Sequence, residues 1–339
     1  MKETVFITGG AGFIAFHLTK RLIKNNVNVV AVDNLNSYYS VDLKKARLEE
    51  LKKLNGEFNF YIGDIEDKFF LEKIFKKHEP KYVVNLAAQA GVRYSIKEPN
   101  LFLQSNIIGF GNILEICKDY EIAHLVYASS SSVYGGNRKL PYSEKDSVDH
   151  PVSIYAASKK SNELMAHVYS HLYSLPATGL RFFTVYGPWG RPDMSYFLFT
   201  KAIFEGKAIN VNNYGKMERD FTFVDDIIES VIRVIKKIPT SNDKFDRNNP
   251  DLSSSWAPHR IFNIGNSDLI NLDYFISTIE EIIGKKTERN LLPMPKGDVQ
   301  STLADTKSLE VYINFKPETS LKYGLKKFVM WYKNYYDIL

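Results

Sequence analysis

The sequence has little cysteine and no long apolar run. A single cysteine, Cys117, among 339 residues excludes an internal disulfide framework and fits a reducing compartment. No apolar run reaches membrane-spanning length. Met1-Lys2-Glu3 leads directly into the apolar residues 5–7, which is too short for the apolar region of a signal peptide. We therefore expect a cytoplasmic protein without a membrane anchor.

A strong charge of either sign is also missing. The chain carries 44 basic and 39 acidic residues, for a formal net charge of +5. This mild excess suits an anionic small molecule and does not indicate nucleic acid as a partner. The basic run 44–53 also contains Glu49 and Glu50, so we interpret it as a solvated helix face. With 44% hydrophobic residues, the chain has ordinary globular composition and is long enough for a large core.

The sequence shows no internal repeat, no clean linker and no clear metal site. His167 and His171 are four residues apart on a helical run, a spacing that can bind metal. No third ligand is suggested nearby, so we expect these histidines to pack or to lie on the surface. Cys117 follows Ile113, Leu114 and Ile116, and we predict that it is a core residue rather than a nucleophile.

The N-terminal segment predicts a dinucleotide-binding turn. An apolar, β-branched strand over residues 3–8 runs into Gly9 and Gly12 and then into an amphipathic run over 16–24. Glycines at a strand-to-helix turn let the backbone approach a pyrophosphate, which then sits on the helix N-terminus. A second strand over 27–32 ends at Asp33. A carboxylate there accepts both adenosine ribose hydroxyls and repels a 2′-phosphate, which favours NAD over NADP.

Strand-like and helix-like segments then alternate along the chain. Further strands are predicted over 58–62, 82–86, 125–128 and 178–185. This alternation indicates right-handed βαβ units and a Rossmann-type, doubly wound parallel sheet. Ligands bind beyond the carboxyl ends of such strands. The candidate cofactor-binding residues cluster at these ends; they are Gly9, Gly12, Phe13, Ile14, Asp33, Asn34, Asp64, Ile65, Leu86, Ala87, Ala88 and Gln89.

The central stretch 129–159 carries the candidate chemistry. It opens with four serines, Ser129 to Ser132, and closes with Tyr155 and Lys159. Positions four apart share one helix face. A phenol ordinarily titrates near ~10, and a neighbouring ammonium lowers that pKa, which makes tyrosine a usable general base at neutral pH. The pair alone is weak evidence for catalysis, because this spacing is common on solvated helices. Its place in the chain, together with candidate residues at the ends of the other predicted strands, favours a catalytic site.

The later part of the chain is less regular. Residues 240–258 are polar and predict an exposed loop, whereas helices are predicted over 272–283 and 320–336. We expect residues 1–180 to form the NAD-binding domain. Residues 181–339 are expected to form a smaller mixed α/β substrate lobe that returns some strands to the main sheet. Arg93, Arg191 and Arg219 lie in places that border the proposed cleft, and guanidinium groups bind phosphate and carboxylate oxygens in two-point fashion.

Four segments together resemble a known family. Residues 33–39, 89–95, 129–135 and 179–194, with the glycine turn and the Tyr155/Lys159 pair, resemble the extended short-chain dehydrogenases/reductases. Within them the chain is most similar to the nucleotide-sugar epimerases, and among these to the UDP-glucuronate 4-epimerases. The resemblance covers essentially the whole chain. It implies a Rossmann fold, tightly held NAD, a UDP-sugar substrate, a homodimer and a role in polysaccharide biosynthesis.

The resemblance also implies roles for individual residues. Tyr155 would be the base at the sugar 4-hydroxyl, Lys159 would bind the nicotinamide ribose, and Ser130 would bond the reacting oxygen. Asn106 and Phe183 would lie near the cofactor. The predicted substrate carboxylate contacts are Ser131, Ser132, Thr184 and Arg191. Arg93 and Arg219 would face the diphosphate or uridine, with Asp298 close by.

The implied reaction is the NAD-dependent 4-epimerisation of UDP-glucuronate to UDP-galacturonate. A transient 4-keto sugar forms, turns over, and receives the hydride back on its opposite face. Three alternatives stay open: a neutral or N-acetylated UDP-hexose as substrate, a UDP-glucuronate decarboxylase, and a non-catalytic NAD-binding regulator. The resemblance implies that decarboxylases of this type carry Thr-Ser-Glu or Thr-Asp-Glu before Val-Tyr-Gly. This chain has Ser131-Ser132 directly before Val-Tyr-Gly and therefore lacks the acidic residue. The intact Ser130, Tyr155 and Lys159 argue against a regulator.

Overall fold

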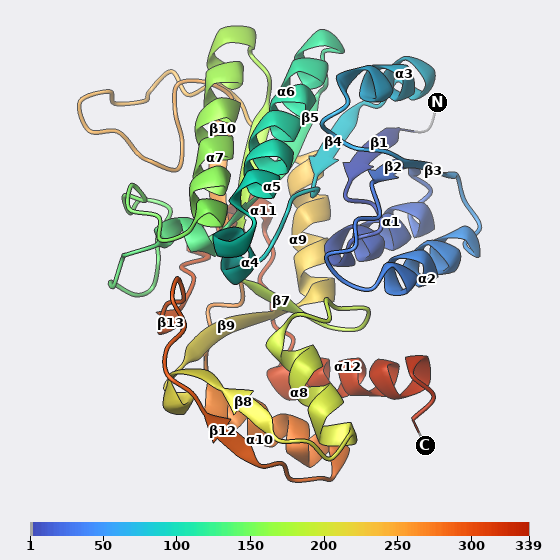
Figure 1. Cartoon of the computed structure of the whole chain (residues 1–339). Coiled ribbons are helices and arrows are strands. Elements are labelled where there is room, and N and C mark those ends of the chain that lie inside the picture. Colours follow the sequence, from blue (N-terminus) through green and yellow to red (C-terminus); the bar gives the residue numbers. More distant parts are fainter. Residues whose placement is uncertain (1–2, 339) are drawn as a thin grey trace.

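A computed structural model describes residues 3–338 of the chain. Seven parallel strands form the main sheet in the order β10-β6-β5-β4-β1-β2-β3 (Figure 1). The strand order reverses between β1 and β4, which creates a crevice at their carboxyl ends. The strands of this sheet are β1 (Thr4–Thr8), β2 (Asn28–Asp33), β3 (Phe58–Ile62), β4 (Tyr82–Asn85), β5 (His124–Ser130), β6 (Ala177–Phe182) and β10 (His259–Ile264). This architecture confirms the predicted doubly wound parallel sheet.

Helices cover both faces of the main sheet because its strands alternate their side chains between two cores. Val5 and Ile7 of β1 belong to the core that includes α1 and α9, whereas Phe6 belongs to the core formed with α3 and α6. The helices around the sheet are α1 (Phe13–Lys24), α2 (Val41–Lys52), α3 (Lys68–His78), α4 (Val92–Lys97), α5 (Pro99–Leu103), α6 (Phe110–Asp119), α7 (Ile154–Tyr173), α9 (Val224–Lys236) and α11 (Lys307–Ile313). A π-helical turn over 104–109 joins α5 to α6.

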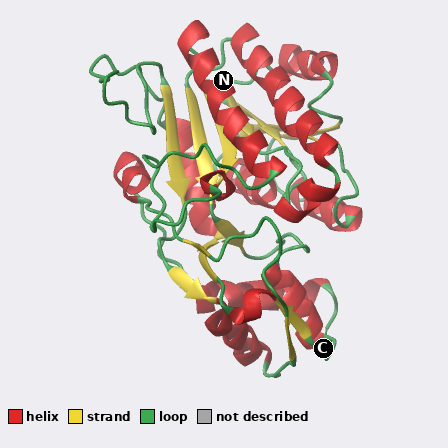
Figure 2. Cartoon of the chain, turned by 60° about the vertical axis from the view of Figure 1, so that its left-hand side comes forward, coloured by secondary structure: helices red, strands yellow, loops and turns green. Residues whose placement is uncertain are grey.

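A smaller part of the protein lies beyond the carboxyl ends of the main strands (Figure 2). Its central strand β9 pairs with β7, β11 and β13, and β8 pairs separately with β12. The strands are β7 (Thr184–Tyr186), β8 (Ile209–Val211), β9 (Glu218–Phe223), β11 (Leu269–Asn271), β12 (Arg289–Leu291) and β13 (Ser301–Thr302). The helices are α8 (Ser195–Phe204), α10 (Leu272–Ile283) and α12 (Leu321–Tyr335).

The single strand predicted over 178–185 is wrong in one respect. The chain forms two strands there: β6 pairs with β5 and β10 in the main sheet, and β7 pairs with β9 in the smaller one. Phe183 lies between them and donates its backbone N–H to the Ile264 carbonyl at 3.1 Å. Since β10 is formed by residues 259–264, the two parts are interleaved along the chain. The proposed boundary at residue 180 stays a prediction.

Three smaller expectations can be compared with the structure. Cys117 is fully buried on α6, as predicted, and burial raises the pKa of its thiol. His171 accepts a hydrogen bond from the Trp256 indole at 2.9 Å, and the His167 ring packs edge-on against the same tryptophan. These contacts confirm ordinary packing for both histidines. Between residues 3 and 338, no helix combines the length and apolar character that a membrane crossing requires.

We predict that the smaller part depends on a stacked aromatic pair. The Phe221 and Phe275 rings lie 4.3 Å apart and nearly parallel, and both residues are buried. Phe275→Ala should lower the free energy of unfolding by about 3–5 kcal/mol, because it removes this contact and leaves a cavity. Denaturant titration measures the change. Tyr274→Ala, at a neighbouring exposed position, should cost less than about 0.5 kcal/mol; equal losses would contradict the prediction.

Candidate active site

One cavity of about 1000 Å³ opens at the carboxyl ends of the main strands, and residues of the smaller part also line it. Of the site residues predicted from the sequence, all except Asn106 line this cavity. They are Gly9, Gly12, Phe13, Ile14, Asp33, Asn34, Asp64, Ile65, Leu86, Ala87, Ala88, Gln89, Arg93, Ser130, Ser131, Ser132, Tyr155, Lys159, Phe183, Thr184, Arg191, Arg219 and Asp298. Their individual roles stay predictions, since position alone does not assign a role.

The glycine turn between β1 and α1 is shaped for close approach of a ligand. Gly9 has φ +69°, and a Cβ atom there would lie 2.9 Å from the Ala87 backbone nitrogen. A Cβ atom on Gly12 would lie 2.8 Å from the Gly9 carbonyl oxygen. Both positions therefore require glycine. The turn places the N-terminus of α1 at the cavity wall, where its free N–H groups and dipole favour a pyrophosphate.

A carboxylate is anchored at the end of β2 beside this turn. Asp33 Oδ2 accepts the Ala11 N–H at 3.1 Å, and Oδ1 accepts the Leu35 N–H at 2.8 Å. Asn34 donates to Asp64 Oδ2 at 2.8 Å, which joins the ends of β2 and β3. A glycine cradle next to a fixed carboxylate is the arrangement that a dinucleotide with a free adenosine ribose requires. The residues present therefore fit NAD.

Asn106 lies behind the cavity wall. Its Oδ1 accepts the Gln89 N–H at 2.8 Å, and its Nδ2 donates to Ser158 Oγ at 2.9 Å. Asn106 thus connects the loop after β4 to α7, and its predicted proximity to the cofactor stays a prediction.

Tyr155 and Lys159 both line the cavity from α7. Ser153 caps this helix by accepting the Ala156 N–H at 3.1 Å. Lys159 is almost completely buried, donates to the Ala128 carbonyl at 2.7 Å, and has its pKa lowered by burial to about 8. Burial raises the pKa of Tyr155 above its ordinary value, and the smaller opposing effects of Ser130 and of the Arg191 charge do not reverse this rise. The lowering of the Tyr155 pKa that we expected from the Lys159 ammonium is therefore wrong for the NAD-free structure, in which Lys159 donates to the Ala128 carbonyl instead.

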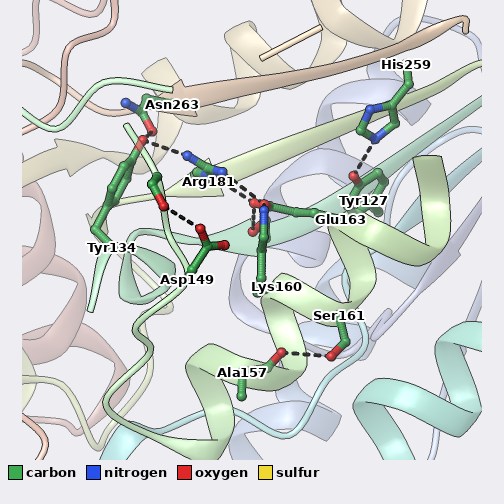
Figure 3. Close-up of polar contacts among 12 residues, drawn as sticks. Tyr127, Tyr134, Asp149, Ala157, Lys160, Ser161, Glu163, Arg181, His259 and Asn263 are labelled. Carbon is green, nitrogen blue, oxygen red and sulfur yellow. Dashed lines mark hydrogen bonds and ion pairs between the residues drawn. The ribbon is translucent and has the colours of Figure 1, made fainter. Parts of the chain in front are cut away.

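A buried polar network supports the serine run from behind (Figure 3). Ser129 donates to Glu163 Oε1 at 2.7 Å, and Arg181 binds both oxygens of the same carboxylate at 2.8 and 2.9 Å. Arg181 also donates to the Tyr134 hydroxyl, which in turn donates to Asn263 Oδ1 at 2.6 Å. Burial raises the pKa of Glu163, but Arg181 outweighs it, and the net pKa is lowered. The network joins β5, α7, β6 and β10 behind Ser130.

Three of the predicted substrate residues gather on the side of the smaller part. Arg93 and Asp298 form an ion pair at 2.7 Å. Arg219 donates to the carbonyls of Val299 and Gln300 at 2.7 and 2.8 Å, directly after Asp298. The loop that carries Asp298 is therefore held by two arginines that are far apart in the sequence.

The interpretation of residues 44–53 as a solvated face is wrong for two of its residues. Lys44 and Arg47 are buried, although Lys52 and Lys53 are exposed. Arg47 lies four residues from both Leu43 and Leu51, so it shares the buried face of α2. This spacing is the signal by which the sequence could have identified it.

Arg47 connects the cofactor turn to the loop after β7. Its Nη1 donates to the Ala11 carbonyl at 2.8 Å, and its Nη2 donates to the Trp189 carbonyl at 2.7 Å. The loop with Arg191 is therefore attached to the glycine turn through a buried guanidinium. Lys44 donates to the Asn36 carbonyl at 2.8 Å and also lines the cavity.

The fold and site define a class of protein. A Rossmann sheet, a glycine turn, an acidic residue at the end of β2, and Ser130, Tyr155 and Lys159 around one cavity are the arrangement of a short-chain dehydrogenase/reductase that uses NAD. The chain belongs to the NAD-dependent epimerase/dehydratase family, whose model matches residues 5–265. It is accordingly an NAD-dependent epimerase, as its relatives also indicate.

Three similar proteins cover nearly the full length. Protein CapI of Staphylococcus aureus is 53% identical over 98% of this chain and 99% of its own length. A probable UDP-glucuronate 4-epimerase of Rhizobium meliloti is 44% identical over 97% of both chains. The crystal structure of UDP-glucuronic acid 4-epimerase from Bacillus cereus, in complex with UDP-glucuronic acid and NAD, has a TM-score of 0.87 at 30% identity and covers 98% of this chain and 100% of that one.

The buried Lys159 predicts a pH dependence of stability. Its pKa in the folded, NAD-free protein is about 8, below the ordinary 10.5, so the unfolded chain binds more protons between these values. Its contribution to the free energy of unfolding should therefore rise as the pH increases from 8 to 10.5. Relative to Lys159→Met, the wild type should gain stability across this window in denaturant titrations of NAD-free protein. The exposed control Lys52→Met should follow the wild type; a constant difference between Lys159→Met and wild type would refute the prediction.

Proposed function

We propose that this protein interconverts UDP-glucuronate and UDP-galacturonate by inversion at C4. The observation that carries the proposal is that a guanidinium and the phenol line the same cavity. Arg191 and Thr184 line the cavity together with Tyr155, and the charge of Arg191 acts on the Tyr155 hydroxyl. A sugar whose reacting carbon faces Tyr155 would thus have its carboxylate within reach of charge-assisted donors. The UDP-glucuronate 4-epimerase relatives support this choice of substrate.

The chain's own residues provide the acid–base part of the reaction. NAD, when bound, supplies a hydride acceptor that returns the hydride in the second half of the reaction. Tyr155 takes the proton of the sugar 4-hydroxyl and later returns it, while Ser130 hydrogen-bonds the reacting oxygen. Burial raises the pKa of the phenol, and the positive charge of Arg191 opposes this rise, which assists transfer of the proton to Tyr155.

Holding the carboxylate also protects the sugar. A 4-keto uronate is a β-keto acid and can lose carbon dioxide. Donors at Ser131, Ser132, Thr184 and Arg191 would keep the negative charge on the carboxylate and oppose that loss. Asp193 also lines the cavity, but it is paired with Arg191 and Tyr38, so it is not a free acid for elimination or decarboxylation. These contacts favour epimerisation over the decarboxylase alternative.

Incubating the purified protein with UDP-glucuronate tests the proposal directly. Without added nicotinamide, the protein should form UDP-galacturonate, because bound NAD ends each turnover as it began. Tyr155→Phe should lower kcat at least ~100-fold, since it removes the proton-transfer group. Chromatographic separation distinguishes the 4-epimer from a UDP-pentose. A UDP-pentose as main product, or turnover of neutral UDP-hexoses alone, would refute the proposal.

If these side chains hold the substrate carboxylate, variants that lack them should bind the substrate more weakly or form a by-product. Thr184→Ala and Arg191→Ala should weaken binding of UDP-glucuronate by about 1.5–3 kcal/mol for a lost charged hydrogen bond, or release a 4-keto-pentose. Initial rates give KM, and mass spectrometry detects the by-product. Unchanged KM and no by-product in both variants would count against these contacts.

We also propose that two copies of the chain pair through α7 and the turn before α6. Leu164, Val168 and Leu172 recur every four residues on α7 and are 58%, 47% and 59% exposed. Ile108, in the π-helical turn, is 53% exposed. Such a row of apolar side chains on one helix face favours association with a second copy. The cytoplasmic location and the role in polysaccharide biosynthesis stay predictions.

A further inference from the structure

The Arg191 side chain uses only one edge of its guanidinium within the protein. Nε donates to Asp193 Oδ1 at 3.0 Å, and Nη2 donates to Asp193 Oδ2 at 2.5 Å. Among residues 3–338 the structure records no acceptor for Nη1. A guanidinium has five N–H donors in a planar fork, so the edge formed by Nη1 and the outer N–H of Nη2 stays available for a second carboxylate.

Asp193 is itself held by a second contact, which comes from the loop after β2. The Tyr38 hydroxyl donates to Asp193 Oδ2 at 3.1 Å, and the Tyr38 ring lies 4.8 Å from the Tyr94 ring. Gly91 has φ +106°, and a Cβ atom there would lie 2.4 Å from the Tyr38 hydroxyl. The absence of a side chain at Gly91 therefore leaves the space that Tyr38 needs to reach Asp193.

The backbone before Arg191 is held independently of Asp193. The His17 ring nitrogen bonds the Pro188 carbonyl at 2.8 Å, and Arg47 binds the Trp189 carbonyl. Burial lowers the pKa of His17 to about 3, so this histidine is neutral at physiological pH. With the backbone held in this way, the contact with Asp193 decides where the Arg191 fork points.

We propose that Asp193 is a positioning residue that determines specificity for an acidic sugar. It binds the Nε–Nη2 edge of Arg191 and thereby orients the Nη1 edge toward the sugar carboxylate. Asp193 also compensates the guanidinium charge while no sugar is bound, so Arg191 stays in the cavity between turnovers. This inference rests on the proposed function, because it requires a substrate that carries a carboxylate.

The alternative is an ordinary ion pair that only stabilises the loop. The Asp193 side chain is 30% exposed, and exposed pairs often contribute little. A structural role would weaken acidic and neutral UDP-sugars alike, because both require the same cavity. A positioning role weakens the acidic sugar selectively. The ratio of the two dissociation constants therefore separates the two interpretations.

The experiment measures binding of UDP-glucuronate and UDP-glucose to the NAD-loaded protein by calorimetry. In Asp193→Asn the preference for UDP-glucuronate should fall at least about tenfold, which corresponds to about 1.4 kcal/mol. The Kd for UDP-glucose should change less than about threefold, which also shows that the variant is folded. Tyr38→Phe, which removes only the hydroxyl, should reduce the preference in the same direction by a smaller factor.

A matched control removes the same charge from the other arginine pair of the cavity. Asp298 pairs with Arg93 at 2.7 Å, so Asp298→Asn should alter binding of both sugars equally and keep the ratio. In an Arg191→Ala background, Asp193→Asn should cause no further change in the ratio, because residues that act as a unit are not additive.

An unchanged or increased preference in Asp193→Asn, or equal weakening of both sugars, would overturn the assignment of Asp193. No preference for UDP-glucuronate in the wild type would overturn it as well. A wild type that shows the preference and loses it in Asp193→Asn, yet forms no UDP-galacturonate, would refute the proposed function and leave the assignment intact.

Discussion

The parallel alignment of β1 and β4 is the constraint on which the site depends. Thr8 pairs with Asn85 in register, and the Thr8 hydroxyl donates to Asn85 Oδ1 at 2.6 Å while accepting the Ala87 N–H at 3.0 Å. These hydrogen bonds hold the carboxyl ends of the two strands together at the point where the strand order reverses. Helices must leave the sheet in opposite directions there, so a crevice opens. The glycine turn of one strand and the loop after the other form its walls.

Buried charges extend this constraint to the substrate side. Arg47 attaches the glycine turn to the loop that carries Arg191. Glu163, which pairs with Arg181, accepts a hydrogen bond from Ser129 and so attaches the serine run to α7. Removing one partner of such a buried pair leaves an uncompensated charge, which is far more costly than the net contribution of the intact pair. The same buried charged residues thus hold both the cofactor-binding and the substrate-binding segments in place.

Much of the site could be predicted because its residues follow predictable strands. Gly9, Asp33, Asp64 and Ser130 each lie at the end of a predicted strand or just after it, and parallel strands place their carboxyl ends at one edge. Arg47 was missed because charge within a basic run suggested solvent. Its burial depends on the carbonyls of Trp189 and Gly190, which approach only after the chain has folded.

The sequence by itself determined the alternation of strands and helices, the glycine turn and the Tyr155/Lys159 spacing, because hydrophobic periodicity and local backbone requirements act between near neighbours. Only the tertiary structure decided which charge acts on which group. Lys159 turns to the Ala128 carbonyl, Arg191 acts on Tyr155, and Tyr38 reaches Asp193 across 155 positions of the chain. Electrostatic interactions and burial depend on distance in space, which the spacing of residues along the chain does not specify.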